Sequence, residues 1–248
     1  MKRVGKGKDR VSGAGSKRMT TNYWLLTLGA FTLIELLVVI SVIAILASLV
    51  FPVTGAVNAA KIKNRAKTEL AEIETAIQRY QTKLGHYPPD NPGNPATNQL
   101  FYELMGTTNT GTTYVTLDGS TSIPVTAVSA AFGPRIGGFV NSTRGSNGDE
   151  ASSATKFLTA LKPNQLAKSP SGAAVLVGVT WQQGPPPFNF DPFGPTAPGI
   201  NPWRYNSSSP TNNPNSYDLW IEVRVGSKTF LICNWSKQPL PLTVHDPY

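Results

Sequence analysis

The sequence predicts an α+β fold in which one long N-terminal helix packs on a small C-terminal antiparallel sheet with long loops. Three observations predict this fold. An apolar run covers Phe31–Val50, and helical periodicity continues from it to Leu84. Near the other end, Tyr217–Val225 alternates between two faces, and Lys228–Trp235 follows after a Gly-Ser turn, as expected for a β-hairpin.

The apolar run is about as long as a bilayer's hydrocarbon core requires of a helix, which is roughly 20 residues. The sequence therefore predicts a transmembrane helix over residues 31–53, which must bury itself in lipid or in copies of itself. Glu35 interrupts this run, and a carboxylate in hydrocarbon costs about 2.5–3.5 kcal/mol on insertion scales, so we expect it to have a partner. Pro52 predicts a kink at the end of the run.

Residues 1–30 form a basic leader in front of the apolar run. Seven lysines and arginines face one acid, Asp9, so the leader carries +6 of the chain's net charge of +8. A basic stretch beside an apolar span predicts a cytoplasmic N-terminus. A nucleic-acid-binding patch is the alternative, which the placement of the charge outside the folded part disfavours. The sequence leaves open whether the chain starts at Met1 or at Met19.

Residues 54–84 are expected to form the amphipathic half of the same helix. Apolar residues recur mostly every three or four positions, and charged residues take much of the remaining surface. The apolar positions are Val57, Ile62, Ala66, Leu70, Ile73, Ile77, Tyr80 and Leu84. Gly85 and Pro88-Pro89 then stop the helix, so its expected range is Thr32–Leu84.

Residues 85–248 are expected to form one globular domain. Asn98–Met105 is a candidate short helix, Phe157–Leu161 a helical turn and Ala173–Trp181 a strand. The stretch Gly106–Ser153 is rich in Thr, Ser and Gly, which predicts a variable loop with weak strands, and Gly184–Ser216 reads as an irregular loop.

Residues with catalytic potential are sparse in this chain. Only two histidines exist, His86 and His245, and one cysteine, Cys233, which is expected to be a buried apolar residue. Nothing assembles a nucleophile, a base and an orienting group, so the chain is not expected to be an enzyme. The many aromatic residues of the C-terminal part are expected to cover a small sheet, with a sugar-binding platform as the alternative.

The segment Gly29–Ile40 (GAFTLIELLVVI) resembles the class III signal of type IV pilins and type II secretion pseudopilins. This resemblance implies a type IV pilin-like fold and cleavage by a prepilin peptidase between Ala30 and Phe31, with methylation of the new amine on Phe31. It also implies that Glu35 pairs with the N-terminus of a neighbouring subunit, and that Pro52 is the helix-kinking proline. Ala30 departs from the family, which usually has glycine before the cut.

The C-terminal part resembles the major pseudopilin in two short elements, Tyr217-Asp218-Leu219 and Asn234-Trp235. In that family an acidic loop between these elements binds calcium. Here Glu222–Lys228 replaces this loop and lacks its aspartates, so the sequence predicts no cofactor and leaves only Asp191 and Asp218 as candidate calcium ligands.

The resemblance implies a structural subunit of a type II secretion pseudopilus. Its partners would be prepilin peptidase, other copies and other pseudopilins, membrane lipid, and an inner-membrane assembly platform with a separate ATPase; no nucleic acid is expected. The chain would be single-pass in the inner membrane with residues 85–248 in the periplasm, and later part of a periplasmic filament. The alternatives are a subunit of a type IV pilus or DNA-uptake filament, and a membrane-anchored enzyme or carbohydrate-binding protein.

Overall fold

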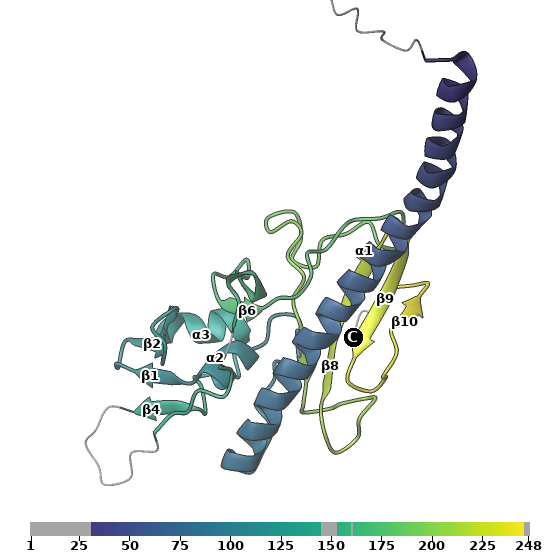
Figure 1. Cartoon of the computed structure of the whole chain (residues 1–248). Coiled ribbons are helices and arrows are strands. Elements are labelled where there is room, and N and C mark those ends of the chain that lie inside the picture. Colours follow the sequence, from purple (N-terminus) through teal and green to yellow (C-terminus); the bar gives the residue numbers. More distant parts are fainter. Residues whose placement is uncertain (1–30, 145–152, 160, 246–248) are drawn as a thin grey trace, which may run out of the picture. The chain divides into compact units, whose positions relative to one another are not determined.

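The computed structural model describes residues 31–144, 153–159 and 161–245, without the side chains of 49–54 and Arg144 (Figure 1). The helices are α1 (Leu33–Leu84), α2 (Leu100–Met105), α3 (Val125–Phe132) and the 3₁₀ turn η1 (Pro163–Gln165). The strands are β1 (Thr107–Asn109), β2 (Thr113–Thr116), β3 (Ser122–Pro124), β4 (Ser142–Arg144), β5 (Leu166–Lys168), β6 (Ala174–Leu176), β7 (Arg204–Asn206), β8 (Asp218–Val225), β9 (Lys228–Cys233) and β10 (Leu240–Leu242).

The predicted fold class is wrong. In place of one small antiparallel sheet, the described residues form three sheets, with the strand orders β3-β2-β1-β4, β10-β9-β8-β7 and β5-β6. The first sheet contains a parallel pair, β1 with β4, and lies within the stretch that composition predicts to be variable loop with weak strands. Its strands have only three or four residues each, too few for a period-two pattern to be legible in a Thr-rich segment.

The predicted transmembrane half is not supported either. Within the part of the chain that the structure describes, no helix is both long enough and apolar enough to cross a membrane. Helix α1 begins at Leu33, one residue later than expected. Pro52 lies inside α1, and the kink predicted there stays a prediction.

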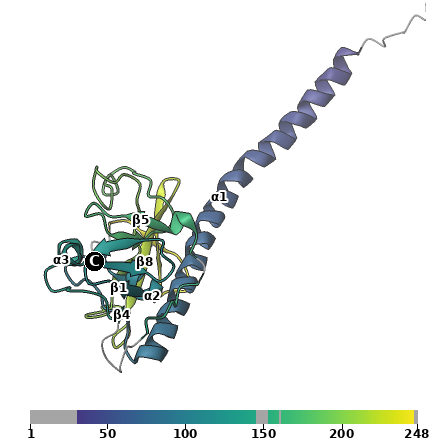
Figure 2. The same cartoon turned by 90° about the vertical axis from the view of Figure 1, so that its left-hand side faces the viewer.

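The chain divides into two compact units, Met1–Leu49 and Val50–Tyr248, and α1 contributes to both. In the second unit, α1 runs beside the sheet that contains β8 and β9 (Figures 1 and 2). The predicted apolar stripe is buried there at Ala66, Leu70, Ile73, Ile77 and Tyr80. At its N-terminal end the stripe prediction is wrong, because Val57 is 58% exposed.

Helix α1 ends as the sequence predicts. Gly85 has a φ of +80° and donates its N–H to the carbonyl of Gln81 at 2.8 Å, a left-handed cap that glycine adopts without strain. The helix therefore stops at Leu84, and Pro88 follows three residues after Gly85.

The predicted hairpin is confirmed as β8 and β9, joined by a turn in which Gly226 has a φ of +60°. Leu219, Ile221 and Val223 on one face of β8 belong to the main core that α1 covers. On the other face, Trp220 packs with Leu231 and Cys233 in a separate small cluster. Both faces of β8 are therefore covered, which explains why its first six residues are all buried.

Three local predictions fail. Phe157–Thr159 is not helical, and the N–H groups of Phe157 and Leu158 both donate to the carbonyl of Leu104. The predicted strand Ala173–Trp181 is shortened to β6, with one further bridge at Val177. The irregular loop predicted over Gly184–Ser216 contains β7, which pairs with β8.

Glu103 in α2 joins three parts of the fold. Its side chain is fully buried and accepts hydrogen bonds from the Tyr80 hydroxyl of α1 at 3.0 Å, from Val140 N–H at 2.8 Å and from Asn141 N–H at 2.9 Å. Burial raises the pKa of Glu103 above its ordinary value of 4.5, against the opposing effect of these three donors. The carboxylate therefore connects α1 to the additional sheet β3-β2-β1-β4.

Candidate functional site

The first candidate site is the segment Phe31–Leu46, which precedes the globular domain in the sequence. We call it the apolar segment. Twelve of its large apolar side chains are between 47% and 80% exposed. They are Phe31, Leu33, Ile34, Leu36, Leu37, Val38, Val39, Ile40, Val42, Ile43, Ile45 and Leu46. They include consecutive positions, so apolar side chains surround the helix on all sides. An exposed apolar surface of this kind marks an interaction site.

The start of α1 is closed by a capping box that links Thr32 and Glu35. The Thr32 N–H and hydroxyl donate to Oε2 of Glu35 at 2.9 and 2.8 Å, and the Glu35 N–H donates to the Thr32 hydroxyl at 3.2 Å. These bonds satisfy donors that would otherwise lack a partner at the helix start. Both bonds to the carboxylate use Oε2, and among the described residues no donor contacts Oε1.

Phe31 precedes the helix and does not share a helical face with Glu35. The sequence-based predictions did not include Thr32, although the Thr-x-x-Glu spacing before an apolar run is the signature of a capping box. Gly29 and Ala30, the other residues of the predicted cleavage site, lie outside the described residues.

The two C-terminal elements singled out in the sequence meet through Asn234. Its Oδ1 accepts the Leu219 N–H at 3.0 Å, and its Nδ2 donates to the Tyr217 carbonyl at 2.9 Å. The Asn234 N–H also donates to the Leu219 carbonyl at 3.1 Å, so Asn234 continues the β8–β9 pairing beyond the end of β9. Trp235 packs edge-on against Trp220, with ring centroids 5.9 Å apart. These elements therefore support the hairpin.

The two candidate calcium ligands are engaged by N–H donors. Oδ2 of Asp218 accepts the backbone N–H groups of Thr211 and Asn212 at 2.8 Å each, and Oδ1 accepts that of Asn213 at 2.9 Å. Asp191 accepts the Gly199 N–H at 2.9 Å and the Gln183 amide at 2.6 Å. N–H groups turn their positive ends towards these oxygens, so the sites suit a bare carboxylate rather than a cation.

No group of three or more His, Cys, Asp or Glu residues that could hold a metal occurs in the described part of the chain. Asp218 instead shapes the loop before β8, because its carboxylate gathers three successive backbone N–H groups. The residues present therefore do not fit a calcium site at Asp191 or Asp218.

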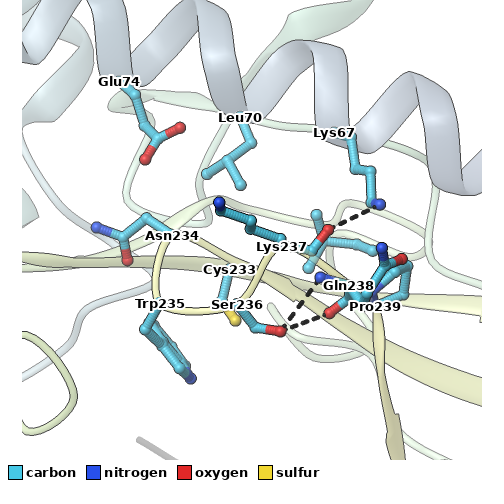
Figure 3. A pocket seen from close by; sticks show the side chains of 11 residues that line it. Lys67, Leu70, Glu74, Cys233, Asn234, Trp235, Ser236, Lys237, Gln238 and Pro239 are labelled. Atoms are coloured by element: carbon cyan, nitrogen blue, oxygen red, sulfur yellow. Dashed lines mark hydrogen bonds between the residues drawn. The ribbon is translucent and has the colours of Figure 1, made fainter.

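A groove of about 470 Å³ lies between α1 and the chain after β9 (Figure 3). Lys67, Leu70 and Glu74 line it from α1, and the residues from Ile232 to Pro239 line it from the other side. The Lys67 ammonium donates to the Lys237 carbonyl at 2.9 Å, which ties the β9–β10 connection to the helix. Burial raises the pKa of Glu74 above its ordinary value of 4.5. The charged residues that line the groove are Lys67, Glu74 and Lys237, and none of its described lining residues is a histidine.

Comparison with known proteins gives one partial similarity. The chain is 38% identical over 63 residues to "Type II secretion system core protein G" of Escherichia coli (strain K12). That match covers 25% of this chain and 43% of the relative, so the chain spans less than half of the relative's length. No family model and no solved structure matches the chain. This partial similarity supports a pseudopilin-like relationship to type II secretion proteins.

Proposed function

We propose that the chain is a structural subunit of a type II secretion pseudopilus, cleaved between Ala30 and Phe31 and polymerised through the apolar segment. The observation that carries this proposal is the exposed apolar surface all around Phe31–Leu46, which includes a single carboxylate, Glu35. The partial similarity to a type II secretion core protein supports the same class. A structural rather than catalytic role is part of the proposal.

Relative to water, burial of the apolar segment against other copies stabilises the filament outside the membrane, whereas relative to lipid it contributes little, because lipid tails are as apolar as these side chains. Fully burying a Leu, Ile or Val side chain contributes roughly 1.5–3 kcal/mol, so twelve half-exposed side chains contribute on the order of 10 kcal/mol or more. The loss of freedom on association costs an estimated 4–15 kcal/mol, so burial and association cost are of similar size. A modest additional contact in the correct register then decides where a new subunit adds.

Glu35 provides that contact in this proposal. Cleavage before Phe31 creates a free amine, which is largely cationic at neutral pH because its reference pKa is about 7.7–8. The capping box keeps Oε2 of Glu35 engaged with Thr32 and holds the side chain at the helix start. The remaining oxygen, Oε1, is the atom we assign to the amine of a neighbouring copy.

The partners in this proposal follow from the assembly route. A prepilin peptidase cleaves and methylates Phe31, an inner-membrane platform adds the subunits, and a separate ATPase supplies the force. The location that goes with this role is the inner membrane before assembly and the periplasm afterwards. Fractionation of cells before and after the platform is induced tests this location.

The test compares Glu35→Leu with a matched control, Glu72→Leu, in the presence of the peptidase and the assembly platform. Glu72 lies in the second half of α1, is half-buried and makes one long contact, 3.3 Å from the Gln165 amide. We expect Glu35→Leu to be cleaved normally but to lose sedimentable polymer, and the control to form polymer. Normal polymer from Glu35→Leu would refute the pairing, and a chain that is never cleaved would refute the proposed function.

A further inference from the structure

We infer that a second cavity in the globular domain is a binding site for a neutral, hydroxyl-rich ligand, a sugar unit of a glycan. The cavity holds about 560 Å³ and lies between the loop 91–97, the end of α3 and two later turns at residues 170–171 and 192–193. Its size falls within the range of small-molecule sites, about 300–1,000 Å³. The inference is independent of the proposed function, because no residue of α1 lines this cavity.

Asn91 supplies an oriented acceptor. Its side chain is buried, and its Nδ2 donates to the Thr97 carbonyl at 2.7 Å, which fixes the direction of the amide. Oδ1 then lies beside two glycines: a Cβ at Gly93 would be 3.8 Å from it and one at Gly133 would be 3.6 Å from it. These two glycines place no side chain of their own beside Oδ1, and no described residue donates a hydrogen bond to it. A ligand hydroxyl can therefore donate to Oδ1.

Two further polar groups line the cavity from different segments. Asn94 uses its Oδ1 to accept the N–H groups of Ala96 and Thr97 at 3.1 and 3.2 Å, so its amide nitrogen remains as a donor at an exposed position. Ser171 is exposed and contacts the Ser169 hydroxyl at 2.7 Å, so its hydroxyl can exchange this contact for one with a ligand. Oriented donors and acceptors on separate walls suit a ligand with several hydroxyl groups.

The remaining walls are apolar. Phe193, Pro192 and Pro170 contribute ring surfaces, and Phe193 is half-buried. The face of an aromatic ring carries partial negative charge and attracts the partly positive C–H groups of a ligand. A sugar ring presents C–H groups on its faces and hydroxyls on its rim, which matches the division between ring surfaces and amides in this cavity.

The lining also argues against other ligand classes. None of the described residues that line the cavity is charged, so an ionic ligand would enter without a counter-charge. None of them belongs to a strand, so an extended peptide would find no sheet edge with which to pair its backbone. A neutral sugar needs neither a counter-charge nor a sheet edge.

The test uses the full chain in a zwitterionic detergent, because a detergent with a sugar head group would compete. The probes are the neutral hexaoses of glucose and of N-acetylglucosamine, an anionic galacturonate oligomer and an uncharged peptide. Saturation-transfer NMR reports which probe binds and through which protons. We expect a neutral hexaose to bind with a Kd of about 1 mM or below, with the strongest transfer to its C–H protons.

Two variants locate the binding. Phe193→Ala removes the ring surface, and Ser171→Trp fills the cavity from an exposed turn position, so at least one of them should leave the fold intact. Each should weaken binding about tenfold or more, while Lys237→Ala, in the groove beside α1, should leave it unchanged. Thermal unfolding of each variant checks the fold. Binding of only the anionic or the peptide probe, no binding at all, or hexaose binding that a folded Phe193→Ala and a folded Ser171→Trp both retain would overturn the inference.

Discussion

Replacement of Glu103 should destabilise the globular domain more than replacement of any half-exposed acid. In Glu103→Ala, the Tyr80 hydroxyl and the Asn141 N–H lose their acceptor, and both residues are buried. Each unsatisfied buried donor costs about 1–3 kcal/mol. Val140 is 53% exposed, so water can replace the bond of its N–H at little cost.

The two buried donors alone give a loss of roughly 2–6 kcal/mol, and removal of the unfavourably buried carboxylate offsets part of it. We therefore expect Glu103→Ala to lower the free energy of unfolding by about 3–4 kcal/mol, or the Tm by roughly 6–16 °C for a domain of this size. Tyr80→Phe removes only one of the bonds and should cost about 1 kcal/mol.

Urea unfolding of the full chain in detergent, followed by circular dichroism, measures these differences. Glu72→Ala is the matched control and should cost less than about 0.5 kcal/mol, because this side chain is half-exposed. A Glu103→Ala variant within about 1 kcal/mol of this control would refute the reasoning, because it would show that the three bonds contribute little.

The same carboxylate gives a pH dependence of defined sign. Its pKa is raised in the folded state, so its contribution to stability is fully present below 4.5 and is lost as the pH rises through the raised value. Burial also raises the pKa values of Glu69 and Glu74, so their contributions to stability are likewise lost as the pH rises, equally in wild type and in Glu103→Gln. The difference in unfolding free energy between wild type and Glu103→Gln should therefore narrow from pH 5 to pH 7.5, as measured by urea unfolding at both values. A difference that widens over this window would contradict the assignment.

Three further predictions concern the helix start, the hairpin and calcium. Thr32→Val removes the hydroxyl of the capping box and should destabilise the first turn of α1 by about 1 kcal/mol, seen as faster amide exchange there than in Thr32→Ser; equal exchange in the two variants would contradict it. Asn234→Ala breaks two bonds that continue the hairpin and should lower the unfolding free energy by about 2 kcal/mol in urea, whereas an unchanged midpoint would show that they contribute nothing. Calcium in excess over chelator should leave the Tm unchanged, because the Asp218 carboxylate already accepts N–H donors and does not suit a cation. Calcium that bound the folded state would raise the Tm, so a concentration-dependent rise would contradict this explanation of the loop.

The sequence predicted the elements whose patterns are long. The apolar stripe of α1 repeats over several turns, and the alternation in β8 and β9 covers fourteen residues in total. Patterns of this length identify the type of each element and its buried face without tertiary information. The strands of the additional sheet have three or four residues, and β7 has three. Such strands are defined by their partners rather than by their own composition, which is why the predicted fold class was wrong.

For the candidate site, the sequence indicated the residue types but not their local bonds. As an acid in an apolar run, Glu35 was expected to pair with a neighbouring subunit. Its hydrogen bond to Thr32, three residues away in the same chain, was not predicted. Asp218 stood out as a candidate ligand, although the loop before it turns its N–H groups towards the carboxylate. The cavity near Asn91 was not predictable, because it brings together four segments that are far apart in the sequence.

The central claim is that the chain is cleaved before Phe31 and assembles through the apolar segment. Its most direct test is the N-terminal mass spectrum of polymer sedimented from cells that contain the peptidase and the assembly platform. The account predicts that sedimented polymer consists of chains that begin at a methylated Phe31 and retain Leu33–Leu46. Polymer built of chains that keep residues 1–30, or of chains that have lost the apolar segment, would contradict it.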